Sequence, residues 1–198
     1  MRKKNIIALL CLTLLVSIAL ILSAKYLNLF DVFVNNYFSV RDDSAISFMK
    51  FISNILEPNL VAIYILILVL LLATKIKKEA VFAFACILVV IPLEIIKILV
   101  HRVRPENILV IENMTKSFPS GHSTMALILF SVLIYLFYDK IKSKFLRILF
   151  VSMGILLVLL VGFSRIYLGA HWFSDVISGY LLALIWFLLC VLVFVKPK

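Results

Sequence analysis

A histidine and an aspartate in the last third of the chain stand at a spacing that supports nucleophilic or acid–base chemistry. In the stretch SRIYLGAHWFSD, His171 and Asp175 are four residues apart, so a helix that begins near His171 would place the carboxylate beside the imidazole. A carboxylate bonded to one ring nitrogen fixes the tautomer, and the other nitrogen is then available as a base, a ligand or a nucleophile. The same pair is also typical of an ordinary helix cap.

Cations accumulate at the end of an earlier apolar run, in the stretch EIIKILVHRVRP. Lys97 and Arg104 are seven residues apart and therefore share one helical face. Glu94 lies on the same face and is expected to pair with Lys97. Such cations either bind an anion or extend from the end of the run toward water. His101 and Arg102 are candidates for contact with a polar headgroup, although a structural role is favoured for both.

A second histidine stands in the stretch FPSGHST, where a turn leads into another apolar run. Ser120, Gly121 and His122 fall at the predicted start of a helix, where unpaired backbone N–H groups and the positive end of the helix dipole attract anions. Gly121 permits close backbone approach or a positive φ. On its own this stretch is also typical of a turn and a helix cap. Arg165, at the end of a further apolar run, adds a third candidate cation.

The elements that position these residues are apolar runs, and their length indicates a membrane protein. Of the 198 residues 65% are hydrophobic, and the mean hydropathy of +1.19 is far above that of soluble domains. Crossing about 30 Å of hydrocarbon takes about 20 helical residues. We therefore predict a single all-α domain over residues 1–198, a transmembrane bundle of six spans. The predicted spans are 6–24, 60–74, 80–100, 123–138, 145–163 and 176–195.

The distribution of lysine and arginine predicts how the bundle is oriented. Most of the 20 basic residues lie at the two termini and in the short connections around 75–78 and 140–147. Because basic loops stay in the cytoplasm, both termini are predicted there, in a multi-pass protein of the cell membrane. The candidate residues then all lie on the extracytoplasmic side. The net charge of +10 does not indicate a nucleic-acid partner, because the basic clusters sit beside span ends and anionic lipid headgroups.

Residues 25–58 form the longest segment between predicted spans. Their aromatic residues indicate one or two helices that lie in the outer membrane interface. Asp42 and Asp43, just before Ser44, are interpreted as a helix cap in preference to a metal site. The N-terminal run also resembles a signal peptide, but its length favours a retained first span. The three cysteines, each inside a predicted span, are expected to pack as small apolar residues.

Together the outward span ends supply cations, an anion-binding helix start and two imidazoles, which suits phosphoryl transfer. The chain reads K-(six residues)-RP over 97–105, PSGH over 119–122, and SR-(five residues)-H-(three residues)-D over 164–175. This ordered triple resembles the signature of the type 2 phosphatidic acid phosphatase family, which includes membrane enzymes of the phosphatidylglycerophosphatase B type. No signature position departs from the pattern, and the six-span layout resembles that of the small bacterial members.

The resemblance implies a role for each matching residue. By it, His171 attacks phosphorus and becomes a phosphohistidine, and Asp175 holds its tautomer. His122 protonates the departing oxygen and then helps to activate water. The phosphate oxygens would be bound by Lys97, Arg104, Ser120, Gly121 and Arg165. Neither a metal nor another cofactor is expected, and the few carboxylates near the motifs agree with metal independence.

The expected function is that of an integral membrane lipid phosphatase acting on a phosphate monoester or pyrophosphate lipid. Because few residues remain for a soluble domain, the substrate is expected to enter from the bilayer. Phosphatidylglycerol phosphate, phosphatidic acid and undecaprenyl pyrophosphate all satisfy this description, and the sequence does not choose among them. The alternatives are a lipid phosphotransferase with the same intermediate and a lipid transporter or binding protein. A transporter would have polar residues along its spans, whereas here they gather at one end.

Overall fold

The computed structural model describes residues 29–38, 42–73, 77–110 and 116–194, with single positions in the N-terminal stretch, and within these ranges the chain is helical and has no strand. The predicted span 6–24 falls largely outside the described residues and stays a prediction. The described elements are α2 (Leu29–Tyr37), α3 (Asp43–Ile55), α4 (Pro58–Ala73), α5 (Lys77–Ile87), α6 (Val90–Val100), α7 (Gly121–Phe137), the 3₁₀ turn η1 (Tyr138–Lys140), α8 (Lys144–Tyr167) and α9 (Phe173–Phe194).

Four stretches in the described part of the chain are long and apolar enough to cross a bilayer: Lys78–Val100, Gly121–Lys140, Lys144–Tyr167 and Phe173–Phe194. They coincide with four of the predicted spans to within about one helical turn. The span predicted at 60–74 corresponds to the 16-residue α4. At about 1.5 Å per residue, α4 reaches only about 24 Å, less than the hydrocarbon thickness of about 30 Å. The predicted total of six is therefore not established, although the all-helical, multi-pass architecture is.

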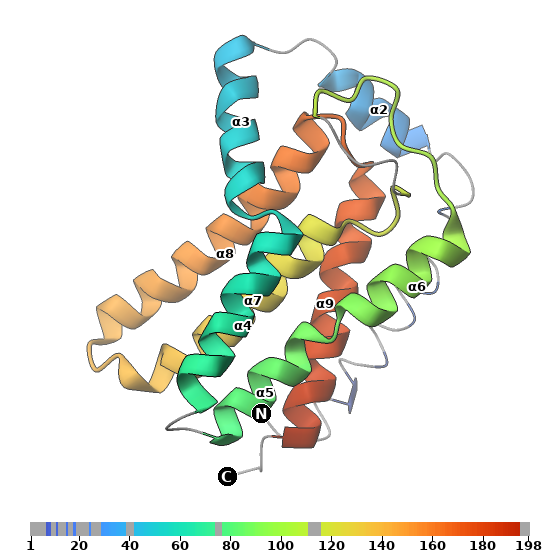
Figure 1. Cartoon of the computed structure of the whole chain (residues 1–198). Helices are drawn as coiled ribbons and strands as arrows, with labels where there is room; N and C mark the ends of the chain where they lie inside the picture. Colours follow the sequence, from blue (N-terminus) through green and yellow to red (C-terminus); the bar gives the residue numbers. More distant parts are fainter. Residues whose placement is uncertain are drawn as a thin grey trace.

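The span predicted as one helix over 80–100 is broken into α5 and α6. Pro92 has no N–H to donate to the carbonyl oxygen of Leu88, four residues earlier. The N–H of Ile91 takes that oxygen instead, at 3.0 Å. The helix therefore tightens at residues 88–89 and changes direction, as the green ribbon in Figure 1 shows. Proline accounts for the difference between the prediction and the structure.

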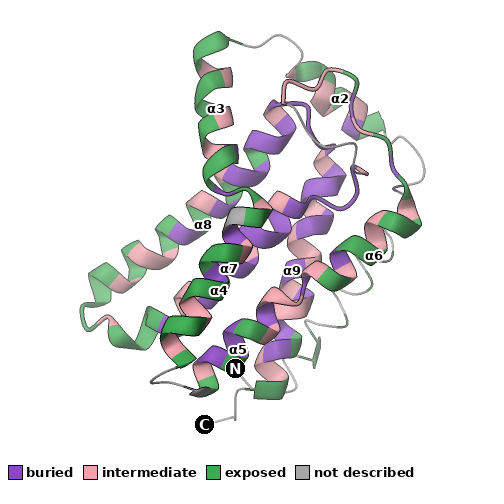
Figure 2. Ribbon diagram, viewed as in Figure 1, coloured by how far each residue is buried: buried purple, intermediate pink, exposed green. Residues whose placement is uncertain are grey.

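Helix α7 lies at the centre of the bundle and packs against α4, α5, α8 and α9. In its span 56% of the residues are buried, whereas 22% are buried in the span of α8. Figure 2 shows the same contrast, with buried residues concentrated on the inner helices and exposed ones on the outward faces of α3 and α8. The exposed faces of the outer helices are apolar, as expected for surfaces that face lipid.

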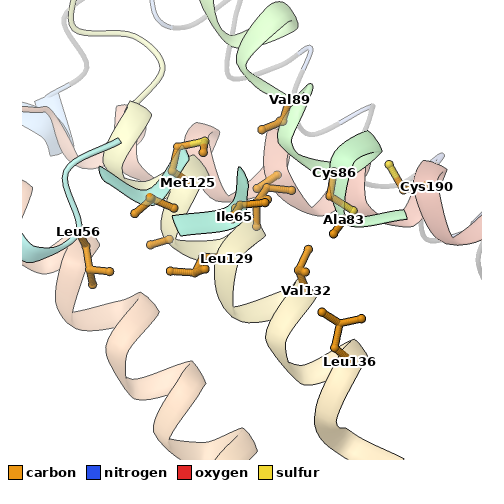
Figure 3. Close-up of a cluster of buried hydrophobic side chains, with 14 of the residues drawn as sticks. Leu56, Ile65, Ala83, Cys86, Val89, Met125, Leu129, Val132, Leu136 and Cys190 are labelled. Atoms are coloured by element: carbon orange, nitrogen blue, oxygen red, sulfur yellow. The ribbon is translucent and has the colours of Figure 1, made fainter. Parts of the chain in front are cut away.

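The apolar core joins α4, α5, α7 and α9. Figure 3 shows Met125 and Val132 of α7 directed toward residues of α4 and α5 such as Ile65. Cys86 and Cys190 are buried at the edge of this cluster, which confirms their prediction as packing residues. The third cysteine, in the N-terminal stretch, is exposed.

A close contact between α7 and α9 fixes the start of both helices. A Cβ atom on Gly179 would lie 2.6 Å from the carbonyl oxygen of Ser120, so only glycine allows this approach. The hydroxyl of Thr124 donates to the carbonyl oxygens of Ser120 at 2.9 Å and of Gly179 at 3.1 Å. The PSGH turn is thereby attached to the first turns of α9.

The turn between α8 and α9 also depends on glycine, as the sequence predicts. Gly169 adopts a φ of +66°, and a Cβ atom there would lie 2.6 Å from the carbonyl oxygen of Asn107. The N–H of Leu109 donates to the carbonyl oxygen of Leu168 at 2.9 Å. The segment that follows α6 is therefore attached to the turn that carries His171.

Helices α2 and α3 lie near the end of the bundle where α8 ends and α9 begins (Figure 1). Asp42 caps α3 as predicted, accepting from the N–H groups of Ser44 at 3.1 Å and Ala45 at 3.2 Å. The Ser44 hydroxyl and these amides lower the pKa of the Asp42 carboxyl. The aromatic residues of both helices are largely exposed, but each helix also buries one polar residue, Asp31 on α2 and Ser53 on α3. Placement of these helices in the membrane interface stays a prediction.

Candidate active site

The candidate residues come from four helix ends at one end of the bundle. Lys97 lies in the last turn of α6, and Arg104 lies in the segment that follows it. The PSGH turn begins α7, Arg165 lies in the last turn of α8, and His171 precedes α9. In Figure 1 these four helix ends point toward the part of the molecule that carries α2.

His171 is buried, and one of its ring nitrogens is fixed by the backbone. Its Nδ1 lies 2.7 Å from the carbonyl oxygen of Ser117. Because a carbonyl only accepts, Nδ1 carries the proton and Nε2 carries the free electron pair. The nearest carboxylate oxygen of Asp175 is 3.7 Å from Nδ1. Asp175 thus lies beside the ring as predicted, but the atom within hydrogen-bond distance of Nδ1 is the Ser117 carbonyl oxygen, so a role for Asp175 in holding the tautomer stays a prediction.

Asp175 instead organises the residues around the imidazole. Its carboxylate accepts from the hydroxyl of Ser117, from the N–H of Trp172 at 2.9 Å, and from Arg102 Nη1 at 2.6 Å. Its main-chain oxygen accepts from the N–H of Ser120 at 3.0 Å. The negative charge of Asp175 therefore stays close to the ring, while the Ser117 carbonyl sets the tautomer of His171.

Arg104 stands in front of the nitrogen that is free to react. Its Nη1 donates to the carbonyl oxygen of Ala170 at 2.6 Å and lies 3.3 Å from His171 Nε2. Burial lowers the pKa of Arg104, and the charge of Asp175 partly opposes this effect. A phosphate group that approaches Nε2 would meet this guanidinium first.

The electrostatic surroundings keep His171 neutral. Burial lowers the pKa of His171 well below its ordinary value of 6.5, the cations Arg104 and Arg165 lower it further, and the Ser117 carbonyl opposes them. Lys97 contributes to the lowering as well. The imidazole is therefore unprotonated at neutral pH, as a nucleophile must be.

Lys97 joins the cluster from α6. Its Nζ pairs with Glu94 Oε1 at 3.1 Å, which confirms the predicted ion pair. A Cβ atom on Gly121 would lie 3.6 Å from Nζ, an ordinary contact, so the ammonium group lies against the PSGH turn. Among the glycines in the described ranges, only Gly169 has a positive φ, so Gly121 does not. Of the two uses predicted for Gly121, close backbone approach is the one that remains.

His122 lies in the first turn of α7, and the charges of His171, Arg104 and Lys97 all act on it. The two imidazoles are thus on the same side of the bundle. Ser120 is fully buried, and its hydroxyl accepts from the N–H of Ser123 at 3.4 Å and from the Ser123 hydroxyl at 3.0 Å. That hydroxyl caps α7, so phosphate binding through it remains a prediction.

Sequence reasoning missed three residues that support this cluster. Ser117 bonds His171, Ser53 of α3 accepts from Arg165 Nη1, and Asp31 of α2 accepts from Arg102. Arg102 has the structural role that was favoured for it, since it is buried between two carboxylates. The one available signal was Asp31, a carboxylate within the apolar stretch LFDVFV.

A cavity of about 490 Å³ adjoins the cluster on the side of α2. It is lined by both apolar and hydrogen-bonding side chains, with Arg104 shared between the cavity and the surroundings of His171. Its lining includes Asn35, Asn36, Arg104, Glu106 and Trp172.

The chain is similar to one protein family, one curated protein and two solved structures. The sequence model described as the PAP2 superfamily matches residues 78–198, more than half of the chain. Phosphatidylglycerophosphatase B of Bacillus subtilis (strain 168) is 36% identical over 98 residues, which cover 48% of each protein. The chain therefore aligns with about half the length of that curated relative.

Two solved structures share the fold. A transmembrane PAP2 type phosphatidylglycerolphosphate phosphatase from Bacillus subtilis has a TM-score of 0.76 at 23% identity, covering 93% of both chains. LpxE of Aquifex aeolicus has a TM-score of 0.60 at 24% identity, covering 81% of this chain and 92% of the other. At these identities the likeness concerns the arrangement of the helices.

Proposed function

Because the chain belongs to the PAP2 superfamily, we propose that it is an integral membrane lipid phosphatase that works through a phosphohistidine. The observation that carries the proposal is the geometry at His171: Nδ1 is held by the Ser117 carbonyl, and Nε2 lies beside the Arg104 guanidinium. A neutral imidazole facing a cation is suited to attack a phosphate dianion, which would repel an anionic nucleophile.

In the first step, the electron pair of His171 Nε2 forms a bond to phosphorus and the bond from phosphorus to the lipid oxygen breaks. His122 gives its proton to the departing oxygen. The ring of His171, now phosphorylated, carries a positive charge that the Ser117 carbonyl and the Asp175 carboxylate stabilise at 2.7 and 3.7 Å. These two acceptors therefore stabilise the step in which the positive charge forms on the ring.

In the second step, water attacks phosphorus and the bond to His171 Nε2 breaks. His122 accepts a proton from the water, and inorganic phosphate leaves. Lys97, Arg104 and Arg165 would neutralise the phosphate oxygens in both steps, and the Gly121 N–H would donate to one of them. No metal is proposed; within the described ranges, groups of three His, Cys, Asp or Glu side chains that could bind one do not occur.

The substrate we propose is a lipid phosphate with a hydroxylated headgroup, phosphatidylglycerol phosphate being the first to test. The two Bacillus subtilis relatives are named for that lipid. The cavity beside Arg104 supports the choice, because the amides of Asn35 and Asn36 can bond hydroxyl groups, whereas Glu106 would repel a second phosphate. Phosphatidic acid and undecaprenyl pyrophosphate are the comparison substrates.

The orientation we propose places this site on the outer side of the membrane and both termini in the cytoplasm. Support comes from the connection between α7 and α8, which carries Lys140, Lys142 and Lys144 at the end of the spans opposite to the PSGH turn. The buried polar residues of the described spans gather at the other end, which favours an enzyme over a transporter.

The test is release of inorganic phosphate by the purified protein in mixed micelles that contain each of the three lipids. We expect hydrolysis in the presence of a metal chelator, fastest with phosphatidylglycerol phosphate. His171→Ala should lower kcat at least about 1,000-fold while the protein remains folded. Transfer of phosphate to an added lipid alcohol without release of inorganic phosphate would replace the hydrolase by a phosphotransferase. Hydrolysis by folded His171→Ala at the parent rate would refute the proposal.

A further inference from the structure

A carboxylate from outside the signature motifs is buried next to the active site. Asp31, on α2, is 1% exposed. Its Oδ2 accepts from Arg102 Nη2 at 2.7 Å and from the Ser174 hydroxyl at 2.6 Å, and its Oδ1 accepts from the Ser174 N–H at 2.9 Å. Burial of a carboxylate is unfavourable unless such partners replace water, so the position of Asp31 depends closely on these two residues.

Arg102 connects Asp31 to Asp175. Its Nη2 binds Asp31, while its Nη1 donates to Asp175 Oδ1 at 2.6 Å and to the Ser174 hydroxyl at 2.6 Å. Arg102 is only 7% exposed, and its guanidinium also lies over the ring of Trp172. One buried cation is thus shared by two carboxylates, and removal of either would change how strongly the other is held.

The same arginine reaches His171 through Ser117. Asp175 accepts from the Ser117 hydroxyl, and the main-chain oxygen of Arg102 accepts from the Ser117 N–H at 2.9 Å. The Ser117 carbonyl oxygen then binds His171 Nδ1 at 2.7 Å. A continuous series of hydrogen bonds therefore runs from Asp31 to the imidazole.

Docking of α2 does not by itself require this carboxylate. The ring of Phe30 packs edge-on against Phe173 with centroids 5.2 Å apart, and Phe38 packs against Phe163 at 5.5 Å. These apolar contacts attach the helix and its following residue to α9 and α8 without any desolvation of charge. The buried ion pair lies instead where the helix meets the residues around His171.

We propose that Asp31 is a positioning residue for catalysis: it orients Arg102, which holds Asp175 and the Ser117 carbonyl in place around the imidazole. The proposal rests on the proposed role of His171 as nucleophile. It makes α2 part of the active site, although this helix lies outside residues 78–198, which match the family.

The test compares Asp31→Asn with Phe30→Ala, a matched change on the same helix that removes a docking contact and keeps the carboxylate. With phosphatidylglycerol phosphate, Asp31→Asn should lower kcat about 10- to 100-fold, the range typical of residues that orient a reactive group through another residue. The KM and the inhibition constant of inorganic phosphate should change less than about threefold. Phe30→Ala should lower the melting temperature and leave kcat within about twofold of the parent.

A double-mutant cycle shows whether the effect passes through Arg102. Arg102→Lys should lower kcat by itself, and Asp31→Asn should add little when combined with it, because both changes break the same connection. Asp31→Glu, which keeps the charge, should retain more activity than Asp31→Asn. If the losses of kcat in Arg102→Lys and Asp31→Asn multiply in the double variant, the proposal is overturned. It is also overturned if Asp31→Asn retains the parent kcat.

Two further outcomes separate this proposal from the proposed function. A parent protein that hydrolyses none of the three lipids removes the proposed function and this inference with it. An active parent with equal losses of kcat in Phe30→Ala and Asp31→Asn would show that α2 acts by docking alone, and the positioning role would be rejected. If neither Asp31→Asn nor Asp31→Glu folds, the carboxylate serves folding, which also rejects it.

Discussion

Replacing Asp175 by asparagine removes one negative charge beside His171 and changes the side-chain volume little. The charge lies 3.7 Å from Nδ1. At an effective dielectric constant of about 20, two unit charges at this distance attract each other by about 4 kcal/mol. This attraction acts only once the ring becomes positive on phosphorylation, so it favours the transition state over the resting enzyme.

Arg102 reduces that figure, because its guanidinium lies 2.6 Å from the other carboxylate oxygen. Asp31 in turn shares the arginine, so the reduction is partial. About 3 to 4 kcal/mol remain, which corresponds to a loss of about 100- to 1,000-fold in kcat. The KM should stay within about threefold, because the Asp175 carboxylate binds Arg102, Ser117 and Trp172, which are not among the proposed phosphate-binding residues.

The assay is the initial rate of phosphate release from phosphatidylglycerol phosphate in mixed micelles, with the melting temperature as a check on folding. An asparagine variant that is folded and retains kcat within threefold of the parent would show that the charge does not stabilise the intermediate. A loss confined to KM would show that Asp175 acts on substrate binding, which would refute the electrostatic reasoning.

Three further predictions follow from contacts at the site. Asn35→Ala should raise the KM for phosphatidylglycerol phosphate several-fold and leave the KM for phosphatidic acid unchanged. The reason is that only phosphatidylglycerol phosphate has a hydroxylated headgroup to occupy the cavity beside Arg104. An unchanged ratio of the two KM values would contradict this prediction. Gly179→Ala should lower the free energy of unfolding by about 1 to 3 kcal/mol, because its Cβ would lie 2.6 Å from the carbonyl oxygen of Ser120. The control is Gly154→Ala, whose Cβ would meet only ordinary contacts of 3.5 Å or more and which should be neutral. Thermal denaturation of both variants checks this. The lowered pKa of His171 means that the unfolded chain binds a proton below pH 6.5 that the folded protein does not. This group should therefore reduce stability by up to about 1.4 kcal/mol for each pH unit below 6.5 and have no effect above it; His171→Gln should lack that component.

The sequence was sufficient to predict contacts between residues that lie within about one helical turn of each other. The spacing of His171 and Asp175 placed ring and carboxylate side by side, and the run from Glu94 to Lys97 predicted their ion pair. Both follow from the period of a helix, which acts over one or two turns. Local periodicity is therefore enough where the partners lie on the same helix or at its cap.

The partners that the sequence could not reveal are distant along the chain. Ser117 lies 54 residues from His171, Ser53 lies 112 from Arg165, and Asp31 lies 71 from Arg102. No periodicity connects such positions, because their contacts arise only when the helices pack. The Ser117 carbonyl that lies 2.7 Å from His171 Nδ1 could not be foreseen for this reason.

Span length was the other difference between sequence and structure. Apolar composition identified α4, but its 16 residues are too few to establish a full crossing. The continuous apolar run over 80–100 hid the break at Pro92, where the missing N–H outweighs the apolar pattern. Hydropathy thus locates apolar helices, whereas their ends and bends depend on individual prolines, glycines and caps.

The most direct test of the account is to identify the phosphorylated residue. The enzyme would be mixed rapidly with phosphatidylglycerol phosphate labelled in its terminal phosphate, quenched in alkali, in which phosphohistidine survives, and analysed by mass spectrometry of its peptides. We expect label on His171 and none in His171→Ala. In a His122 variant supplied with a substrate whose leaving group needs no protonation, label should accumulate. Turnover of the lipid with no phosphorylated enzyme, or with the phosphate on His122 or another residue, would contradict it.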